Sequence, residues 1–87
     1  MNQNIIFPDL QDWDDASQQI IFPAQVMGAN IKCRVSLSRL TKLNGEELTE
    51  GAQVLEAFER SRFDIEDHIE ELIEQEKFDE DGGVSWC

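Results

Sequence analysis

The sequence predicts a small α+β fold, in which a small antiparallel β-sheet packs on two or three α-helices to form two layers. Two observations predict it. Between residues 52 and 77, apolar residues recur at helical spacing along one stripe: Leu55, Phe58, Ile65, Ile69 and Leu72, with Val54 and Ile73 beside them. Before residue 37, short apolar runs alternate with polar residues instead, as in half-buried strands. We therefore expect the sheet and the helices to bury each other's apolar sides.

The length of 87 residues fits one domain, residues 1–87, with room for a single modest core. No apolar run is long enough to cross a bilayer, and the first residues lack the basic and apolar regions of a secretory signal. We therefore expect a cytoplasmic protein. Two cysteines, Cys33 and Cys87, make no disulfide framework, and in a reducing compartment both should remain thiols.

The net charge of −12 lies entirely in the second half of the chain. Residues 1–43 hold four acids and four bases, which sum to zero, whereas residues 44–87 hold fifteen acids and three bases, which sum to −12. Charge of this sign repels nucleic acid and anionic membranes, so we expect neither as a direct partner. The bases of the first half should neutralise the protein's own acids: Lys32, Arg34, Arg39 and Lys42.

The central hairpin is predicted over residues 19–27 and 31–36. Centring its turn just after Gly28 makes every facing pair apolar and places these pairs on one face: Val26 with Ile31, Ala24 with Cys33, Phe22 with Val35 and Ile20 with Leu37. Pro23 then selects the loop, because proline cannot complete a hydrogen-bonded pair. A four-residue loop over residues 27–30, or a bulge at Pro23, keeps Pro23 at a non-bonded site.

The remaining elements are predicted from local signals. Residues 4–8 and 84–86 form short terminal strands, and residues 9–15 form a loop whose Trp13 covers the core.

Helices follow residue 36. The first, over residues 39–43, is capped by Ser36 or Ser38 and stops at an Asn-Gly pair. The second begins after Thr49 and ends near residue 60. A break between residues 61 and 64 separates it from a third helix that ends near residue 77, although the stripe alone does not exclude one continuous helix.

These segments also carry a family resemblance. It rests on IIFPD at residues 5–9, Trp13-Asp14, FPA at residues 22–24, the Gly28 turn, the strand with Cys33, RFDIE at residues 62–66 and the late Trp86. In this order they resemble the YrdB-like family of small acidic gamma-proteobacterial proteins, which is classed as a domain of unknown function. The resemblance spans nearly the whole chain. It implies a compact α+β domain and supplies no catalytic residues.

The sequence predicts no enzyme, no metal site and no cofactor. His68 is the only histidine, and neither HExxH nor CxxC is present. The acidic run DEDGG at residues 79–83 lacks the ligand pattern of an EF-hand loop. No nucleophile motif or phosphate-binding loop occurs either.

The acidic last helix carries like charges one turn apart: Glu66 with Glu70, Glu70 with Glu74, and Asp67 with Glu71. Each such pair costs a helix roughly 0.2–0.5 kcal/mol, so local helix stability does not explain this surface. Such a surface fits either a docking surface for a basic protein partner or charge that reflects solubility or drift alone, and we favour the docking surface. The candidate binding residues are Asp67, Glu70, Glu71 and Glu74.

The sequence leaves three functional hypotheses open. The favoured one is a non-enzymatic protein-interaction or regulatory adaptor that docks a basic partner surface through its acidic helices. The first alternative is a nucleic-acid mimic that occupies a nucleic-acid-binding protein. The second is a small-ligand or metal-binding domain that uses the other, partly apolar face of the sheet near Ile21 and Met27. We expect a monomer or a weak homodimer.

Overall fold

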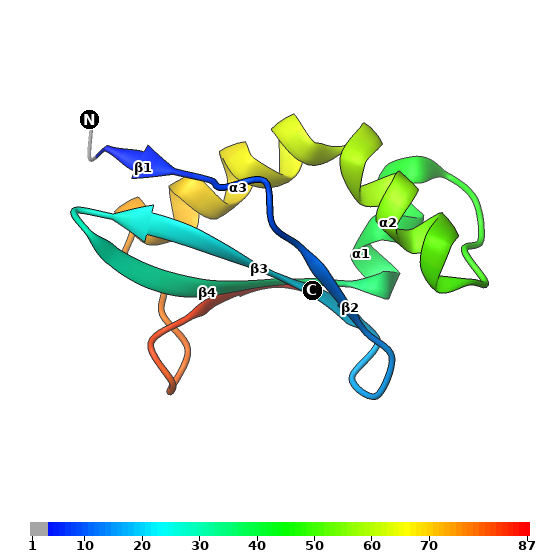
Figure 1. The fold of residues 1–87 in the computed structure, drawn as a ribbon, viewed down its shortest axis with the longest axis horizontal. Coiled ribbons are helices and arrows are strands. Elements are labelled where there is room, and N and C mark those ends of the chain that lie inside the picture. Colours follow the sequence, from blue (N-terminus) through cyan, green and yellow to red (C-terminus); the bar gives the residue numbers. More distant parts are fainter. Residues whose placement is uncertain (1–3) are drawn as a thin grey trace.

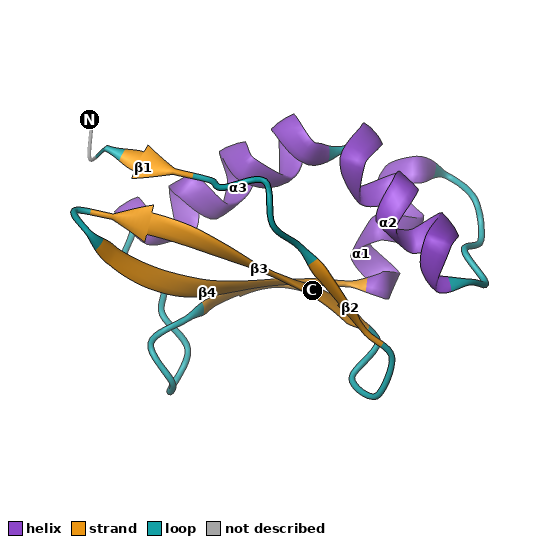
Figure 2. Cartoon of the chain, viewed as in Figure 1, coloured by secondary structure: helices purple, strands orange, loops and turns teal. Residues whose placement is uncertain are grey.

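A five-stranded sheet carries three helices on one of its faces (Figure 1). The computed structural model describes residues 4–87. The strands are β1 (Ile5–Ile6), β2 (Asp12–Asp14), β3 (Gln19–Val26), β4 (Ala29–Ser36) and β5 (Val84–Trp86), and the helices are α1 (Leu37–Asn44), α2 (Gly51–Arg60) and α3 (Arg62–Glu74). Figure 2 shows all three helices on the same side of the β3–β4 hairpin, which confirms the predicted α+β class with two layers.

The core lies between the sheet and the helices. The sheet contributes Ile20, Phe22, Ala24, Cys33, Val35 and Val84, and the helices contribute Leu40, Val54, Ala57, Phe58, Ile65, Ile69 and Ile73. The predicted helical stripe is therefore buried, with Leu55 and Leu72 half-buried at its margins. Trp13 packs against this core, as predicted, and its indole lies against Gly51 at the start of α2.

The predicted hairpin register is wrong by two residues. The strands span residues 19–26 and 29–36, and the pairs are Val26 with Ala29, Phe22 with Cys33 and Ile20 with Val35. The turn has two residues, Met27 and Gly28, with φ of 51° and 85°, as in the type I′ turns that suit hairpin twist. A shift of two preserves the facing of every side chain, so the predicted buried face is correct.

Pro23 sits where no backbone donor is needed. The Val26–Ala29 pair closes the two-residue loop, so hydrogen-bonded pairs alternate from it and the Pro23–Lys32 pair is a non-bonded one. The other edge of β3 has no paired residue between Ile21 and Gln25. The prediction that Pro23 lies at a non-bonded site is therefore correct. A two-residue loop placed one position earlier than the predicted turn meets this requirement, so no longer loop is needed.

The outer edge of β3 is covered by one interrupted strand. β1 pairs with its end near Val26, and β2 pairs with its beginning near Ile20. Between them, the five residues 7–11 stand opposite the three residues 22–24, so the edge bulges outward by two residues. Residues 12–14, which we predicted as loop, form β2 because Trp13 alternates inward while the backbone of this segment pairs with β3.

β5 pairs with β4 in parallel, so the sheet is mixed and the prediction of a purely antiparallel sheet is wrong. The strand itself lies where predicted, over residues 84–86. Parallel neighbours need a crossover connection, and here all three helices lie in the connection between β4 and β5. This crossover places the helices across the sheet (Figure 1).

The helix ends have identifiable caps. Ser36 caps α1, since its Oγ accepts a hydrogen bond from the Arg39 N–H at 3.0 Å, and α1 is longer than the predicted residues 39–43. Glu50, and not Thr49, is the N-cap of α2. Gln53 Oε1 accepts hydrogen bonds from the backbone N–H groups of both Thr49 and Glu50, at 2.8 and 3.3 Å.

The long helical stretch is two helices. They are interrupted at Ser61, whose φ of −102° and ψ of 12° lie outside helical geometry. The predicted break is thus correct, and the continuous alternative is excluded. α3 ends at Glu74, before the predicted residue 77, with the Lys77 N–H donating to the Leu72 carbonyl at 2.9 Å and Glu76 at a φ of 57°.

Candidate functional site

The four candidate carboxylates lie along the side of α3 that points away from the core. Ile65, Ile69 and Ile73 repeat every four residues and are buried against the sheet. Asp67, Glu71 and Glu74 are exposed, and Glu70 is half-buried. The structure therefore brings the four predicted residues together on one helix, and we refer to them as the acidic face of α3.

Within residues 4–87, none of these four carboxylates is paired with a base. The ion pairs of Asp9, Glu46, Glu59, Glu66, Asp79 and Asp81 all lie elsewhere. The acidic face of α3 consequently combines like charges one turn apart with no internal counter-charge. Its last member, Glu74, also stands at the negative end of the helix dipole, where a carboxylate is unfavourable.

Arg62, at the start of α3, is the hub of a separate group in which three carboxylates share one guanidinium. Its guanidinium pairs with Glu66 at 2.7 Å, and with Glu59 and Asp9 at 3.3 Å each. It also donates to the Pro8 carbonyl at 2.9 Å. The side chain is only 14% exposed. Arg62 thus fastens the bulge of the edge strand to the junction of α2 and α3.

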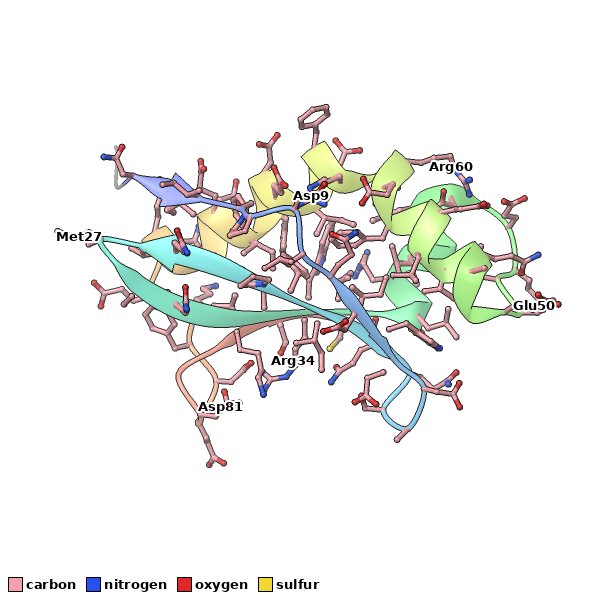
Figure 3. All side chains as sticks on the ribbon, in the orientation of Figure 1. Asp9, Met27, Arg34, Glu50, Arg60 and Asp81 are labelled. Atoms are coloured by element: carbon pink, nitrogen blue, oxygen red, sulfur yellow. The ribbon has the colours of Figure 1, made fainter. Side chains whose placement is uncertain are left out.

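Gln11 completes this group. Its Oε1 accepts a hydrogen bond from Arg62 at 2.9 Å, while its Nε2 donates to Glu59 at 2.9 Å. We refer to Arg62 and its side-chain partners Asp9, Gln11, Glu59 and Glu66 as the Arg62 cluster. Figure 3 shows Asp9 of this cluster beside α3, whereas Met27 lies away from the cluster at the far tip of the hairpin.

Two large apolar side chains adjoin the Arg62 cluster. Phe63 follows Arg62 and is 82% exposed, and Leu10 lies between Asp9 and Gln11 and is 62% exposed. Neither was predicted as a surface residue. Phe63 falls outside the stripe of Phe58, Ile65 and Ile69, so the helical periodicity already indicated that it points outward.

The acidic loop after α3 is tied to the sheet by one arginine. Arg34 on β4 pairs with Asp79 at 3.3 Å and with Asp81, on the face away from the helices (Figure 3). The hydrogen bond with Arg34 lowers the pKa of Asp81, and the same bond raises the pKa of the Arg34 guanidinium. The expectation that the bases of the first half neutralise the protein's own acids is therefore confirmed for Arg34, whereas Lys32, Arg39 and Lys42 form no ion pair within residues 4–87. The Arg34 guanidinium occupies two carboxylates that a cation would need.

His68 stacks on Trp86 rather than facing solvent alone. The two ring centroids are 4.0 Å apart, with an angle of 19° between the ring planes. The Arg39 guanidinium lies 5.0 Å from the centroid of the Trp86 ring and donates to the Cys87 carbonyl at 2.9 Å. This stack joins α1, α3 and β5, so its arrangement serves packing between elements.

An open groove lies on the other face of the sheet. It has a volume of about 280 Å³ and is lined near Ile21 by Pro23, Asn30, Lys32 and Asp12. Met27, which the small-ligand or metal-binding hypothesis names together with Ile21, is 85% exposed at the hairpin tip. In the part of the chain that the structure describes, no three side chains of His, Cys, Asp or Glu gather as metal ligands. The groove has polar groups from Asp12, Asn30 and Lys32, but because it is open it would bury little of a ligand's surface.

Cys33 lies in the core beneath the helices, and Cys87 is exposed at the end of the chain. Burial raises the pKa of the Cys33 thiol to about 12. A thiol with this pKa stays protonated at neutral pH, and only the thiolate is a good nucleophile. Cys33 is therefore a core residue and no candidate for chemistry.

The comparisons with known proteins agree with this structure. The model of a family described as "Protein of unknown function (DUF1488)" matches residues 5–85. The chain belongs to the DUF1488 family. Relatives of this family member include two proteins named "Uncharacterized protein YrdB". The one from Escherichia coli (strain K12) is 36% identical over 97% of this chain and 96% of its own length, and the one from Shigella flexneri is 34% identical over the same shares.

A solved structure shares the fold of this DUF1488 family member. It is the crystal structure of a protein of unknown function from the same family, from Shewanella loihica PV-4. The two chains are 42% identical, the TM-score is 0.93, and the match covers 98% of this chain and 93% of the other. The resemblance to the YrdB-like family is thus confirmed. Over residues 4–87, no helix has the length and apolar character needed to cross a bilayer.

Proposed function

We propose that this protein is a non-enzymatic adaptor or regulator that docks on a basic protein surface through the acidic face of α3. One observation carries the proposal. Asp67, Glu70, Glu71 and Glu74 gather on the outer side of one helix, and none of them has a counter-charge within residues 4–87. A partner with Lys or Arg at the spacing of helical turns would supply those charges and relieve the repulsion between the carboxylates.

The place of action that we propose is the cytoplasm. Both cysteines are free, one in the core and one at the surface. Free thiols fit a compartment that keeps cysteines reduced.

The proposal is tested by capture of partners from a bacterial lysate with two matched variants. The α3 variant carries Asp67→Asn, Glu70→Gln, Glu71→Gln and Glu74→Gln. The control variant carries Asp12→Asn, Glu47→Gln, Glu56→Gln and Glu80→Gln, four exposed carboxylates from other elements. Each variant changes the net charge from −12 to −8, so the two differ only in where charge is removed.

We expect the wild type and the control variant to capture the same protein at about 0.1 M salt, and the α3 variant to lose it. Washing at about 1 M salt should release the partner, because the Debye length falls from about 10 Å to about 3 Å. Equal losses in both variants would show that only total charge matters and would contradict the proposal. Capture that resists salt would contradict it as well.

A further inference from the structure

Leu10 and Phe63 are two exposed apolar residues that Arg62 links, although they lie far apart in the sequence. Arg62 bonds to both neighbours of Leu10, since its Nη1 contacts Asp9 Oδ1 at 3.3 Å and Gln11 Oε1 at 2.9 Å. Phe63 is the residue that follows Arg62 in α3. The two side chains therefore flank the Arg62 cluster, and they are 62% and 82% exposed.

This exposure is built into the fold. The bulge lifts residues 7–11 away from β3, and Arg62 then holds this segment by its Pro8 carbonyl and by Gln11. The Arg62 guanidinium itself rests 5.5 Å from the centroid of the buried Phe58 ring. Because Arg62 fixes the segment at Pro8 and at Gln11, on either side of Leu10, the Leu10 side chain is held outward. An anchor that is already ordered loses little conformational entropy when a partner binds.

The surroundings of the pair select the chemistry of what binds it. Asp9 and Glu59 of the Arg62 cluster have side chains 88% and 48% exposed, and Asp67 lies one turn after Phe63 on α3. An anionic membrane surface would be repelled by these carboxylates, and so would nucleic acid. A second copy of this chain would present the same acidic surface to itself. Apolar side chains with acids beside them instead complement a partner segment that has apolar side chains flanked by cations.

We infer that Leu10 and Phe63 are the apolar anchors of a docking site for a basic amphipathic helix of a partner protein, with the acidic face of α3 supplying the charge contacts. This inference rests on the proposed function, because the cations of the helix are those that α3 binds. Steps of three and four residues along α3 lead from Phe63 to Asp67, Glu70 and Glu74. A helix that lies beside α3 presents its own side chains at a matching pitch of about 5.4 Å per turn.

The test uses two synthetic peptides of about 18 residues, long enough to form helices. The first carries leucines at helical spacing and lysines elsewhere. In the second, every leucine is replaced by alanine, which keeps the charge and the helix propensity. Each peptide carries a fluorescent label, and fluorescence anisotropy at about 0.1 M salt gives its affinity for the folded protein.

We expect the wild type to bind the leucine peptide about tenfold more tightly than the alanine peptide, as an anchor worth about 1.4 kcal/mol predicts. Phe63→Ala and Leu10→Ala should each reduce this preference, and the double variant should abolish it. Met27→Ala is the matched control, because Met27 is 85% exposed at the far tip of the hairpin, and it should keep the preference. Thermal melts establish that each variant is folded.

The possible outcomes separate the two proposals. If the double variant keeps the tenfold preference, or if the wild type has none, the apolar anchors are wrong while charge docking stands. If the α3 variant binds both peptides as tightly as the wild type does, the proposed function itself fails. If sedimentation shows that Phe63→Ala converts a dimer into a monomer, the patch is a self-interface and the inference is overturned.

Discussion

Single residues in this protein carry contacts that bind whole segments together, and Arg62 is the clearest case. Its planar guanidinium reaches three carboxylates, a backbone carbonyl and an amide oxygen from one position. In the sequence, Arg62 falls in the gap of the apolar stripe between Phe58 and Ile65, and nothing more distinguishes it. Its partners Pro8, Asp9 and Gln11 lie at the other end of the chain, so no local pattern could have predicted the cluster.

Replacing Arg62 tests this role. Arg62→Ala should lower the free energy of unfolding by about 2–3 kcal/mol, because Glu66, with its side chain only 20% exposed, loses its partner. Arg62→Lys keeps the charge but cannot reach several acceptors at once, and it should cost about 1 kcal/mol. Urea unfolding measures both. A lysine variant as unstable as the alanine variant would show that the geometry of the guanidinium matters more than its charge. If neither substitution changed the free energy of unfolding, the role of Arg62 as a hub would be refuted.

The two cysteines should differ in reactivity. An aromatic disulfide reagent at neutral pH should label Cys87 at once, because it is exposed, and should label Cys33 only after denaturation. Counting the thiols released with and without denaturant measures this. Rapid labelling of both thiols in the folded protein would contradict the placement of Cys33 in the core.

Cys33 also gives a pH dependence with a definite sign. Its pKa is 9.0 in a free thiol and about 12 in the folded protein, so between these values the folded state keeps a proton that the unfolded state has lost. Stability should therefore fall as the pH rises above 9.0, by at most about 1.4 kcal/mol per pH unit. Cys33→Ala should show a shallower decline over the same range. Equal slopes in the two proteins would mean that the thiol does not contribute.

At the scale of elements, the sequence predicts types better than it predicts pairing. The period-two and helical patterns identify the buried faces of β3, β4 and α3 correctly. The hairpin register depends on one turn, and Met27 at a φ of 51° is an unusual residue for the first position of a type I′ turn, so its signal was weak. The parallel direction of β5 follows from the path of the helices, which no local pattern in residues 84–86 reveals.

Gly83 shows how closely β5 approaches β4. A Cβ atom at Gly83 would overlap the backbone carbonyl oxygen of Lys32, so Gly83→Ala should displace the start of β5 and cost about 2–3 kcal/mol. Gly82→Ala is the matched comparison. Gly82 has a φ of 86° but open space around it, so its substitution should cost only about 1 kcal/mol. Thermal unfolding of the two variants measures the difference, and equal losses would show that backbone strain alone is at work.

At the scale of the whole molecule, the acids differ in whether they pair with a base. Three carboxylates of the Arg62 cluster share one arginine, and Asp79 and Asp81 in the loop after α3 share Arg34. Both groups fasten distant segments. The acidic face of α3 does neither within residues 4–87. Composition predicted where the charge lies, and the helical period predicted that Asp67, Glu71 and Glu74 point outward. The division into fastening and free carboxylates required the tertiary contacts.

The proposal that the acidic face of α3 serves binding and not folding is tested most directly by urea unfolding of the α3 variant. Neutralising four like-charged residues removes several repulsive pairs and a carboxylate at the wrong end of the dipole. The free energy of unfolding should therefore rise by about 1 kcal/mol over the wild type, while the control variant changes by less. An α3 variant that is less stable than the wild type would show that these carboxylates hold the fold together, and the proposal would be wrong.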